Sequence, residues 1–232
     1  MLSIVIPTYN EEKYLPKLLE SIEKQNLKNY EIIIADNSST DNTRNIAKKY
    51  ECRIVKGGER PGIGRNNGAK FAKGNLLLFL DADCCLEKGF LKGLLKEFKE
   101  RELVVASCFL RPMSKRIVDK FYFSVFNNFI KLTEQMYPTL GGACILVRKG
   151  IHNKINGFDK DVKILEEYDY VKACLKYGKF GVINQQINTS VRRFDSEGRL
   201  NVAKTLILSN IYRVFFGPIK KDVFNYDFDK KK

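Results

Sequence analysis

The sequence is poor in the residues that build soft-metal and disulfide sites. Its one histidine, His152, has no histidine or cysteine at ligand spacing, so we interpret it as a surface or helix-end residue. The cysteines show no paired metal-ligand spacing, and a chain of 232 residues does not need disulfides to hold a core. We therefore predict reduced thiols at all six positions, which are Cys52, Cys84, Cys85, Cys108, Cys144 and Cys174.

Long apolar stretches and an export signal are also missing. No wholly apolar run is longer than that at residues 76–80, which is far short of the roughly 20 residues that cross a bilayer. The chain begins with a strand-like segment where a leader would show a basic start and then an apolar stretch. These absences favour a cytoplasmic protein that does not span a membrane, although such a protein can still lie on one.

Acidic residues are outnumbered by basic ones. There are 27 Asp and Glu against 41 Lys and Arg, which gives a net charge of +14. The excess favours anionic partners: nucleic acid, phosphorylated ligands or an anionic membrane surface. Charge alone does not distinguish among them.

What is present indicates one folded α/β domain, with 44% hydrophobic and 12% aromatic residues. Short β-branched or apolar runs at residues 2–6, 31–35, 52–55 and 76–80 each precede a helical pattern, which predicts βαβ units on a parallel sheet. Ligands bind at the carboxyl edge of such sheets. We predict a first helix directly after the first strand, with Asn10 as its cap and Glu11 and Glu12 in its first turn.

Beyond about residue 101 the pattern is less regular, with predicted strands at 103–109 and 143–147 around an aromatic helix at 117–130. A further helix at 200–216 places Asn201, Thr205, Ser209 and Arg213 at four-residue spacing and is otherwise mostly apolar. Such a helix either packs on the domain or lies in a bilayer interface, with nearby lysines at anionic headgroups. The phenylalanines of the aromatic helix pose the same choice. Residues 230–232 form a basic tail.

The sharpest feature is Asp81-Ala82-Asp83, directly after an apolar strand. On an extended backbone residues i and i+2 point to the same side, so both carboxylates can converge at the edge of the sheet. Two hard oxygen ligands there suit Mg²⁺ or Mn²⁺. The adjacent Cys84 and Cys85 are interpreted as packed thiols, because these hard ions prefer oxygen ligands. The alternative is a polar turn that ends a buried strand.

Two further polar segments lie near strand ends. Asp36 closes the second strand, where its carboxylate can accept hydrogen bonds from a nucleobase or ribose, whereas Ser39 and Asp41 suit helix capping. Residues 59–68 are predicted to form a flexible basic loop that enters a helix ending near residue 73. Arg65 and the amides at that helix start suit phosphate oxygens, although the glycine spacing is not the dinucleotide fingerprint.

Four motifs in order over residues 1–83 resemble family 2 glycosyltransferases of the GT-A fold. They are Ser3-Ile-Val-Ile-Pro7-Thr8-Tyr9-Asn10-Glu11, Asp36-Asn37-Ser38, Gly64-Arg65-Asn66-Asn67-Gly68 and Asp81-Ala82-Asp83. The resemblance implies an α/β, Rossmann-like mixed sheet flanked by helices, a nucleotide-diphosphate sugar donor and a Mg²⁺ or Mn²⁺ cofactor. It also implies that Arg65 approaches the diphosphate and that Asp83 and Asp81, with Ala82 between them, hold the metal. The implied nucleoside site is Pro7, Thr8, Tyr9, Glu11, Asp36 and Ser38.

The second half extends the resemblance through Gly141-Gly142-Ala143-Cys144, Asn156-Gly157-Phe158-Asp159 and Leu165-Glu166-Glu167-Tyr168-Asp169-Tyr170. The family usually shows Glu-Asp-x-Asp where this chain has Glu166-Glu167-Tyr168-Asp169. Glu167 aligns with the catalytic base and Glu166 competes for that role, with Asp169 as the third acidic candidate. The alternative is an acidic first turn that the helix dipole favours.

A late segment, Asn188-Thr189-Ser190-Val191-Arg192-Arg193-Phe194, resembles an Arg-Arg-aromatic segment of some small family members. By that resemblance Arg192 or Arg193 closes over the diphosphate, because a planar guanidinium suits phosphate oxygens. A solvated basic turn is the alternative.

The prediction is therefore a single-domain, metal-dependent, inverting glycosyltransferase of glycolipid, cell-envelope or polysaccharide synthesis. Residues 1–100 would bind the nucleotide sugar, residues 101–198 the acceptor, and residues 199–232 would form the amphipathic helix and tail. Predicted partners are a hydroxyl or phosphate acceptor, saccharide or lipid-linked, and an anionic membrane on its inner face, with no nucleic acid. Two alternatives stay open: a nucleotidyltransferase, which would carry an early Gly-rich loop, and a non-catalytic basic module, which leaves the Asp pair unexplained.

Overall fold

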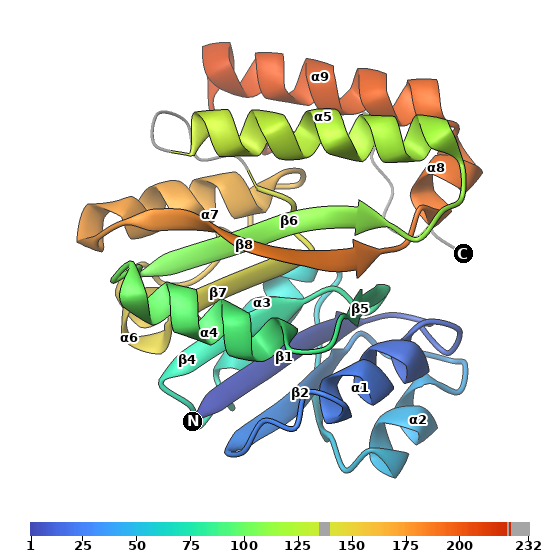
Figure 1. The fold of residues 1–232 in the computed structure, drawn as a ribbon, viewed down its shortest axis with the longest axis vertical. Coiled ribbons are helices and arrows are strands. Elements are labelled where there is room, and N and C mark those ends of the chain that lie inside the picture. The colour runs from blue at the N-terminus through green and yellow to red at the C-terminus, as the bar shows by residue number, and fades with distance from the viewer. Residues whose placement is uncertain (135–139, 222, 224–232) are drawn as a thin grey trace.

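The computed structural model describes residues 1–134, 140–221 and 223. The predicted basic tail at residues 230–232 lies outside the described residues. Within the described part, the chain folds around an eight-stranded sheet with the order β3-β2-β1-β4-β7-β6-β8-β5 (Figure 1). The strands are β1 Leu2–Thr8, β2 Tyr30–Asp36, β3 Arg53–Lys56, β4 Leu76–Leu80, β5 Cys84–Leu86, β6 Val105–Pro112, β7 Cys144–Arg148 and β8 Phe180–Thr189.

The first four strands of the sheet order run parallel, as the alternating pattern predicts. The sheet then becomes mixed, because β7 pairs antiparallel with both β4 and β6 while β6 and β8 run parallel. The β1–β2 register places Thr8 opposite Asp36, so the carboxyl ends of these strands meet at one edge. The ligand-binding edge of the predicted sheet is therefore present.

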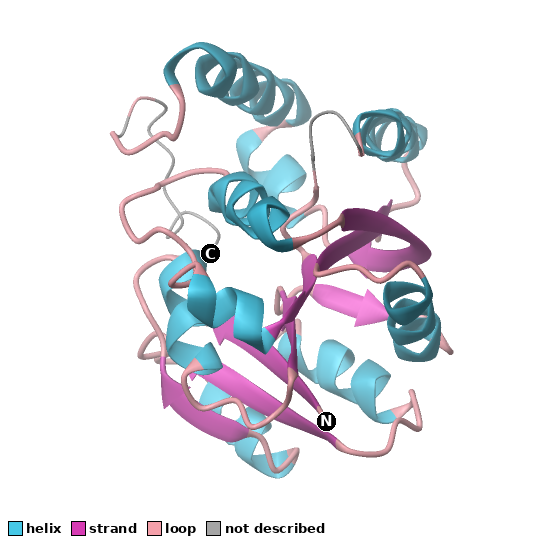
Figure 2. Cartoon of the chain, turned by 90° about the vertical axis from the view of Figure 1, so that its left-hand side faces the viewer, coloured by secondary structure: helices cyan, strands magenta, loops and turns pink. Residues whose placement is uncertain are grey.

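Helices cover both faces of the sheet (Figure 2). They are α1 Leu15–Glu23, α2 Thr43–Lys49, α3 Pro61–Ala69, α4 Phe90–Glu100, α5 Ile117–Thr133, α6 Lys149–Lys154, α7 Glu166–Cys174, the short 3-10 helix η1 Leu175–Tyr177, α8 Arg192–Glu197 and α9 Arg199–Phe216. Side chains alternate along each strand, so β1 sends Ile4 and Ile6 into one apolar cluster and Val5 into another. The first cluster includes buried residues of α1 and α4, and the second those of α7.

Two predicted helix boundaries near the carboxyl edge are wrong. Asn10 does not cap a helix: its φ is 53°, and α1 begins only at Leu15. The intervening turn is closed by the Glu11 carbonyl, which accepts bonds from the amides of Tyr14 and Leu15 at 3.0 and 2.9 Å. Glu11 therefore lies before the helix, where its side chain can face the edge of the sheet.

The predicted basic loop at residues 59–68 is also wrong, because Pro61–Ala69 is itself helix α3. Its glycines are dictated by close packing against β1. A Cβ added at Gly68 would lie 2.3 Å from Cγ1 of Val5, and one at Gly64 would lie 3.0 Å from Cβ of Pro7. Glycine disfavours helix in isolation, so this segment is helical because tertiary packing outweighs propensity.

His152 is buried in the second apolar cluster, which corrects the surface interpretation. Its Nδ1 lies 2.8 Å from the Tyr170 hydroxyl, and its ring packs beside Phe79. Burial lowers the pKa of His152 to about 4, with a further contribution from Lys149. The ring is therefore a neutral core group near neutral pH.

The helices α5 and α9 lie on the same side of the molecule, beyond β6 and β8 (Figures 1 and 2). An ion pair joins them, since Arg199 of α9 bonds both carboxylate oxygens of Asp119 in α5 at 2.6 and 2.9 Å. In the described part of the chain, no helix has the length and apolar character needed to cross a membrane.

Candidate active site

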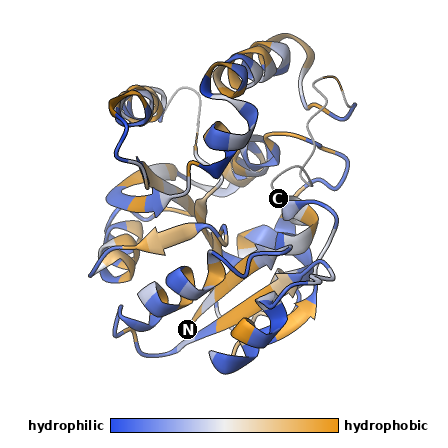
Figure 3. Cartoon of the chain, turned by 90° about the vertical axis from the view of Figure 1, so that its right-hand side faces the viewer, coloured by the Kyte–Doolittle hydropathy of each residue, from blue (hydrophilic) through white to orange (hydrophobic). Residues whose placement is uncertain are grey.

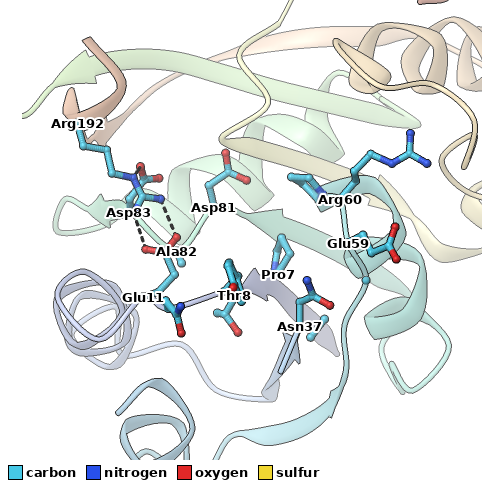
Figure 4. Close-up of a pocket in the computed structure, with 15 residues that line it drawn as sticks. Pro7, Thr8, Glu11, Asn37, Glu59, Arg60, Asp81, Ala82, Asp83 and Arg192 are labelled. Atoms are coloured by element: carbon cyan, nitrogen blue, oxygen red, sulfur yellow. Dashed lines mark hydrogen bonds and ion pairs between the residues drawn. The ribbon is translucent and has the colours of Figure 1, made fainter. Parts of the chain in front are cut away.

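A cavity of about 110 Å³ lies at the carboxyl edge of the parallel strands (Figure 4). Segments that follow β1, β2 and β4 line it, together with the loop that enters α3 and one residue of α8. The lining residues are Pro7, Thr8, Tyr9, Asn10, Glu11, Ala35, Asn37, Gly58, Glu59, Arg60, Pro61, Asp81, Ala82, Asp83 and Arg192. We call this the first cavity.

One wall of the first cavity is an arginine held between two carboxylates (Figure 4). Arg192 bonds both carboxylate oxygens of Glu11 at 2.8 and 2.7 Å, and its Nε lies 3.0 Å from Asp83 Oδ2. Its guanidinium also stacks over Tyr14, 4.7 Å from the ring centroid. Both carboxylates stabilise the charged arginine, so they raise its pKa although burial acts in the opposite direction.

Asp36 lies beside this cavity and is 5% exposed. Its Oδ1 accepts hydrogen bonds from the hydroxyls of Thr8 and Ser39, at 3.0 and 2.6 Å. Its Oδ2 accepts the Ser39 amide at 3.1 Å. Asp36 therefore holds the ends of β1 and β2 together, next to Ser38, whose φ of 58° turns the chain sharply.

The two predicted capping residues have different partners. Asp41 accepts the amide of Thr43 at 3.0 Å, at the first residue of α2, so it supports the helix start. The Ser39 hydroxyl accepts the Asn10 amide at 2.9 Å, in addition to bonding Asp36. Ser39 therefore joins the strand ends.

Arg65 lies on α3, is 2% exposed and joins the two acidic motifs. Its Nη2 donates to Asp81 Oδ1 at 2.8 Å and its Nη1 donates to Glu166 Oε1 at 3.0 Å. The Gly142 carbonyl accepts a third bond at 3.0 Å. These three partners occupy both Nη groups, so Arg65 lies between the acidic residues and does not line the first cavity.

A second cavity, of about 260 Å³, adjoins the first and shares Pro61 and Asp81 with it. Its polar lining includes Arg65, Glu166, Glu167 and Arg193, whereas aromatic and aliphatic side chains supply most of the rest. These apolar residues are Leu110, Tyr122, Phe123, Phe126, Leu140, Ala143, Ile164, Leu165, Tyr168, Val191, Phe194, Val202 and Leu206. The two arginines of the late segment thus separate, with Arg192 in the first cavity and Arg193 in the second.

Glu167 is a buried carboxyl group of the site with a shifted pKa. It is 9% exposed and lies next to Gly142, because a Cβ added at that glycine would be in ordinary contact with Oε1 of Glu167, at 3.5 Å. Burial raises the pKa of Glu167 to about 8, and the neighbouring Glu166 adds to the rise while Arg65 opposes it. A carboxylate with a raised pKa is a stronger proton acceptor once ionised.

The third acidic residue of α7 has a structural partner. Arg213 of α9 bonds both carboxylate oxygens of Asp169, at 2.7 and 3.1 Å, and also donates to the Leu165 carbonyl at 3.3 Å. Leu165 precedes α7 and has a φ of 59°, a conformation that non-glycine residues rarely adopt. Arg213 therefore fixes the end of α7 that carries Glu166 and Glu167.

The residues at the carboxyl edge fit a hard divalent cation. Asp81 and Asp83 both line the first cavity, and their oxygens are the ligand type that Mg²⁺ and Mn²⁺ prefer. The described residues contain no group of three or more His, Cys, Asp or Glu side chains placed to hold a metal. Two protein carboxylates suit an ion that takes its other ligands from substrate phosphates and water.

Several lining residues were missed at the sequence level. Asn37, Glu59 and Arg60 line the first cavity, and Figure 4 shows the last two on the side opposite Arg192. The Arg60 guanidinium donates to the carbonyls of Lys160 and Val162, at 2.5 and 3.3 Å. These partners lie about 100 positions away in the sequence, so no local sequence pattern indicates the contact. The only signal is that Arg60 belongs to the basic segment at residues 59–68.

The model of the family described as glycosyl transferase family 2 matches residues 3–155. A glycosyltransferase of Haemophilus influenzae, described as uncharacterized, is 27% identical over 78% of this chain and 64% of its own length. A poly(ribitol-phosphate) beta-glucosyltransferase of Bacillus spizizenii is 32% identical over 78% of this chain and 30% of its own length. The chain thus spans less than two thirds of the length of these relatives.

Two solved structures share the fold. The Staphylococcus aureus protein TarS, residues 1–349 in complex with UDP, superposes with a TM-score of 0.68 and 24% identity, covering 91% of this chain and 65% of that one. The mannosyltransferase PcManGT of Pyrobaculum calidifontis, in complex with GDP-Man and Mn²⁺, gives a TM-score of 0.72 and 17% identity, covering 92% and 64%. These likenesses identify the fold as GT-A, as the sequence motifs predict.

Proposed function

Because the chain belongs to glycosyl transferase family 2, we propose that it is an inverting glycosyltransferase that uses a nucleotide-diphosphate sugar and a divalent metal ion. The observation that carries this proposal is the junction of the two cavities. The first cavity contains the Asp81-Ala82-Asp83 motif, the second contains Glu166 and Glu167, and Asp81 lines both. A sugar held at Asp81 is thus within reach of groups from both sides.

The first cavity is the proposed donor site. Pro7, Thr8 and Tyr9 at the end of β1 offer a surface for the nucleoside. Asp36 supports that surface by accepting a hydrogen bond from the Thr8 hydroxyl. Asp81 and Asp83 would hold Mg²⁺ or Mn²⁺, which would offset the negative charge that grows on the leaving diphosphate. PcManGT, with GDP-Man and Mn²⁺, supports a metal-bound donor of this kind.

Arg192 would exchange partners when the donor binds. Its guanidinium bonds Glu11 and Asp83, so it lies beside one of the proposed metal ligands. A diphosphate offers oxygens that suit the same planar fork. We infer that Arg192 moves from Asp83 to the diphosphate, which frees the carboxylate for the metal while the arginine keeps an anionic partner.

The second cavity is the proposed acceptor site, with Glu167 as the base. The acceptor hydroxyl gives its proton to Glu167 as its oxygen attacks the anomeric carbon. The bond from that carbon to the diphosphate breaks on the opposite face, which inverts the configuration. The bond between Glu166 and Arg65 supports a positioning role for Glu166, and Arg193 would meet an acceptor phosphate.

The acceptor class follows from the same cavity and from the relatives. The cavity has both charged and apolar lining residues, which suits an acceptor with a hydroxyl or phosphate on a larger apolar or saccharide body. The Bacillus spizizenii relative is a poly(ribitol-phosphate) beta-glucosyltransferase. We therefore infer a role in the synthesis of a cell-envelope polymer, glycolipid or polysaccharide.

Ligand-dependent thermal stabilisation tests the donor site. UDP, GDP, CDP and dTDP are each added with and without Mn²⁺ or Mg²⁺, because a ligand that binds the folded state raises its stability. We expect a metal-dependent shift with one nucleotide class, and its loss in Asp83→Asn. Asp161→Asn, at an exposed position outside both cavities, is the matched control. No shift with any nucleotide would contradict the proposed donor site.

Turnover of the matching nucleotide sugar tests the base. Glu167→Gln is expected to keep the nucleotide-induced shift and to lower hydrolysis or transfer by about 100- to 10,000-fold, the usual range for a general base. Unchanged turnover in this variant, with the loss appearing in Glu166→Gln, would move the base to Glu166.

A further inference from the structure

Helix α5 presents an apolar face to the outside of the protein. At about 100° per residue, its exposed apolar residues fall within an arc of about 120°. They are Ile117, Val118, Phe121, Val125, Phe129 and Leu132, with Ile117 84% and Leu132 80% exposed. The opposite side of the helix is buried through Asp119, Phe123 and Ile130.

Helix α9 also exposes apolar residues to the outside of the protein and buries polar ones. Its exposed apolar residues are Leu200, Ile207, Leu208, Ile211, Val214, Phe215 and Phe216, with Leu200 86% and Phe215 76% exposed. Its buried residues are Val202 and the polar Ser209, and Arg213 points inward to Asp169. Two of the four polar residues that the sequence places at four-residue spacing therefore face the protein, and much of the apolar surface faces outward.

Both helices are firmly attached to the domain. Phe123 of α5, Phe194 of α8 and Val202 of α9 form one apolar cluster, and the Arg199–Asp119 pair joins α5 to α9. Figure 3 shows orange segments on these helices at the end of the molecule far from β1 and β2. Single exposed apolar residues are ordinary, but two helices on one side that each expose six or more indicate an interaction surface.

The charges on the two helices favour an anionic partner. The described helix α9 contains no acidic residue, and the one acidic residue of α5, Asp119, is 1% exposed and paired with Arg199. Exposed lysines accompany the apolar faces: Lys120 and Lys131 on α5 and Lys204 on α9. Basic residues beside an apolar helix face are the pattern that binds an anionic lipid surface.

We propose that the outward faces of α5 and α9 bind an anionic lipid bilayer, with both helices lying in the plane of the interface. Apolar side chains enter the boundary between headgroups and acyl chains, and the lysines contact anionic headgroups. The same helices contribute Tyr122, Phe123, Val202 and Leu206 to the second cavity, which would therefore lie next to the membrane. Lipid binding does not depend on the proposed transfer reaction, so the two can fail separately.

The absence of tryptophan from the sequence allows a site-specific test. Phe121→Trp and Phe215→Trp each place a single tryptophan on one of the two faces, and Phe71→Trp is the control. Phe71 is 43% exposed and packs under Arg53 of β3, a strand at the edge of the sheet. The 232-residue chain is mixed with vesicles of phosphatidylcholine alone or with phosphatidylglycerol, and tryptophan emission is recorded.

With the anionic vesicles we expect a blue shift and quenching by brominated acyl chains at positions 121 and 215, and neither at position 71. Binding should weaken as salt is added, because surface charges are screened. In co-sedimentation, Phe121→Ser and Phe215→Ser should each lower the partition coefficient roughly tenfold or more, given the apolar area lost.

Two results would overturn the proposal. One is the absence of emission changes at both test positions, or an equal change at the Phe71→Trp control. The other is a lipid-free dimer that dissociates in Phe121→Ser and Phe215→Ser while vesicles recover no protein, because a second copy would then be the partner of this surface.

Discussion

The raised pKa of Glu167 makes a quantitative prediction about stability. Burial raises this pKa from 4.5 to about 8, so between these values the folded state keeps a proton that the unfolded chain releases. Stability therefore falls as pH rises through this window, by about 1.4 kcal/mol per pH unit. Glu167→Gln imitates the protonated form and removes the dependence. From pH 6 to pH 7.5 the variant should gain about 2 kcal/mol relative to the natural chain.

Chemical denaturation of both proteins at several pH values measures this difference. Comparing the variant with the natural chain at each pH cancels the other titrating groups, provided that their surroundings are unchanged. Glu100→Gln, at an exposed position of α4, is the matched control for the loss of a carboxylate. A difference between Glu167→Gln and the natural chain that is constant from pH 6 to pH 7.5 would refute the reasoning, because Glu167 would then be ionised in both states.

Three further predictions concern packing and buried charge. Gly68→Ala should lower the free energy of unfolding by about 1 to 3 kcal/mol, since its Cβ would lie 2.3 Å from a valine methyl of β1. Gly150→Ala, with open space around its Cβ, is the control. Equal denaturation midpoints for the two variants would contradict the packing argument. The pKa of His152 is lowered to about 4, so in this pH range the unfolded chain binds a proton that the folded protein does not. The stability of the natural chain relative to His152→Gln should therefore fall by about 1.4 kcal/mol per pH unit as pH drops from 6.5 to 4. Parallel acid-denaturation profiles of the two proteins would contradict this. Arg213→Gln should destabilise by about 3 kcal/mol, because it leaves the Asp169 carboxylate partly buried without its partner; an unchanged denaturation midpoint would show that the pair contributes nothing.

The strands could be predicted because their signal is local. The β-branched or apolar runs at residues 2–6 and 76–80 match β1 and β4 within two residues at each end, since burial on both faces of a parallel strand requires such runs. The helix predicted to end near residue 73 was placed too late in the sequence, since α3 covers Pro61–Ala69, and the reason is the opposite one. Its glycines suggest a loop, and only the approach of β1 to Gly64 and Gly68 explains why glycine is needed there. Packing partners that are distant in the sequence cannot be identified from the helix's own residues.

In the site, too, the sequence indicates which residues lie there but not which groups they bind. Asp81 and Asp83 line one cavity, as their positions after a strand predict, and Glu11, which the family resemblance places at the site, lines the same cavity. Asp36 lies beside this cavity, because its carboxylate accepts hydrogen bonds from the Thr8 and Ser39 hydroxyls. A strand-end aspartate has the same sequence signal whether it faces a ligand or binds the neighbouring strand.

Arginine pairing explains how so many carboxylates can lie close together. Arg65 lies between Asp81 and Glu166, and Arg192 lies between Glu11 and Asp83. Without these cations the neighbouring carboxylates would repel one another. Under the proposed function, an incoming diphosphate would bring negative charge to the same place, and a divalent ion would compensate for it. The metal and the donor should therefore bind together, because each offsets the electrostatic cost of the other.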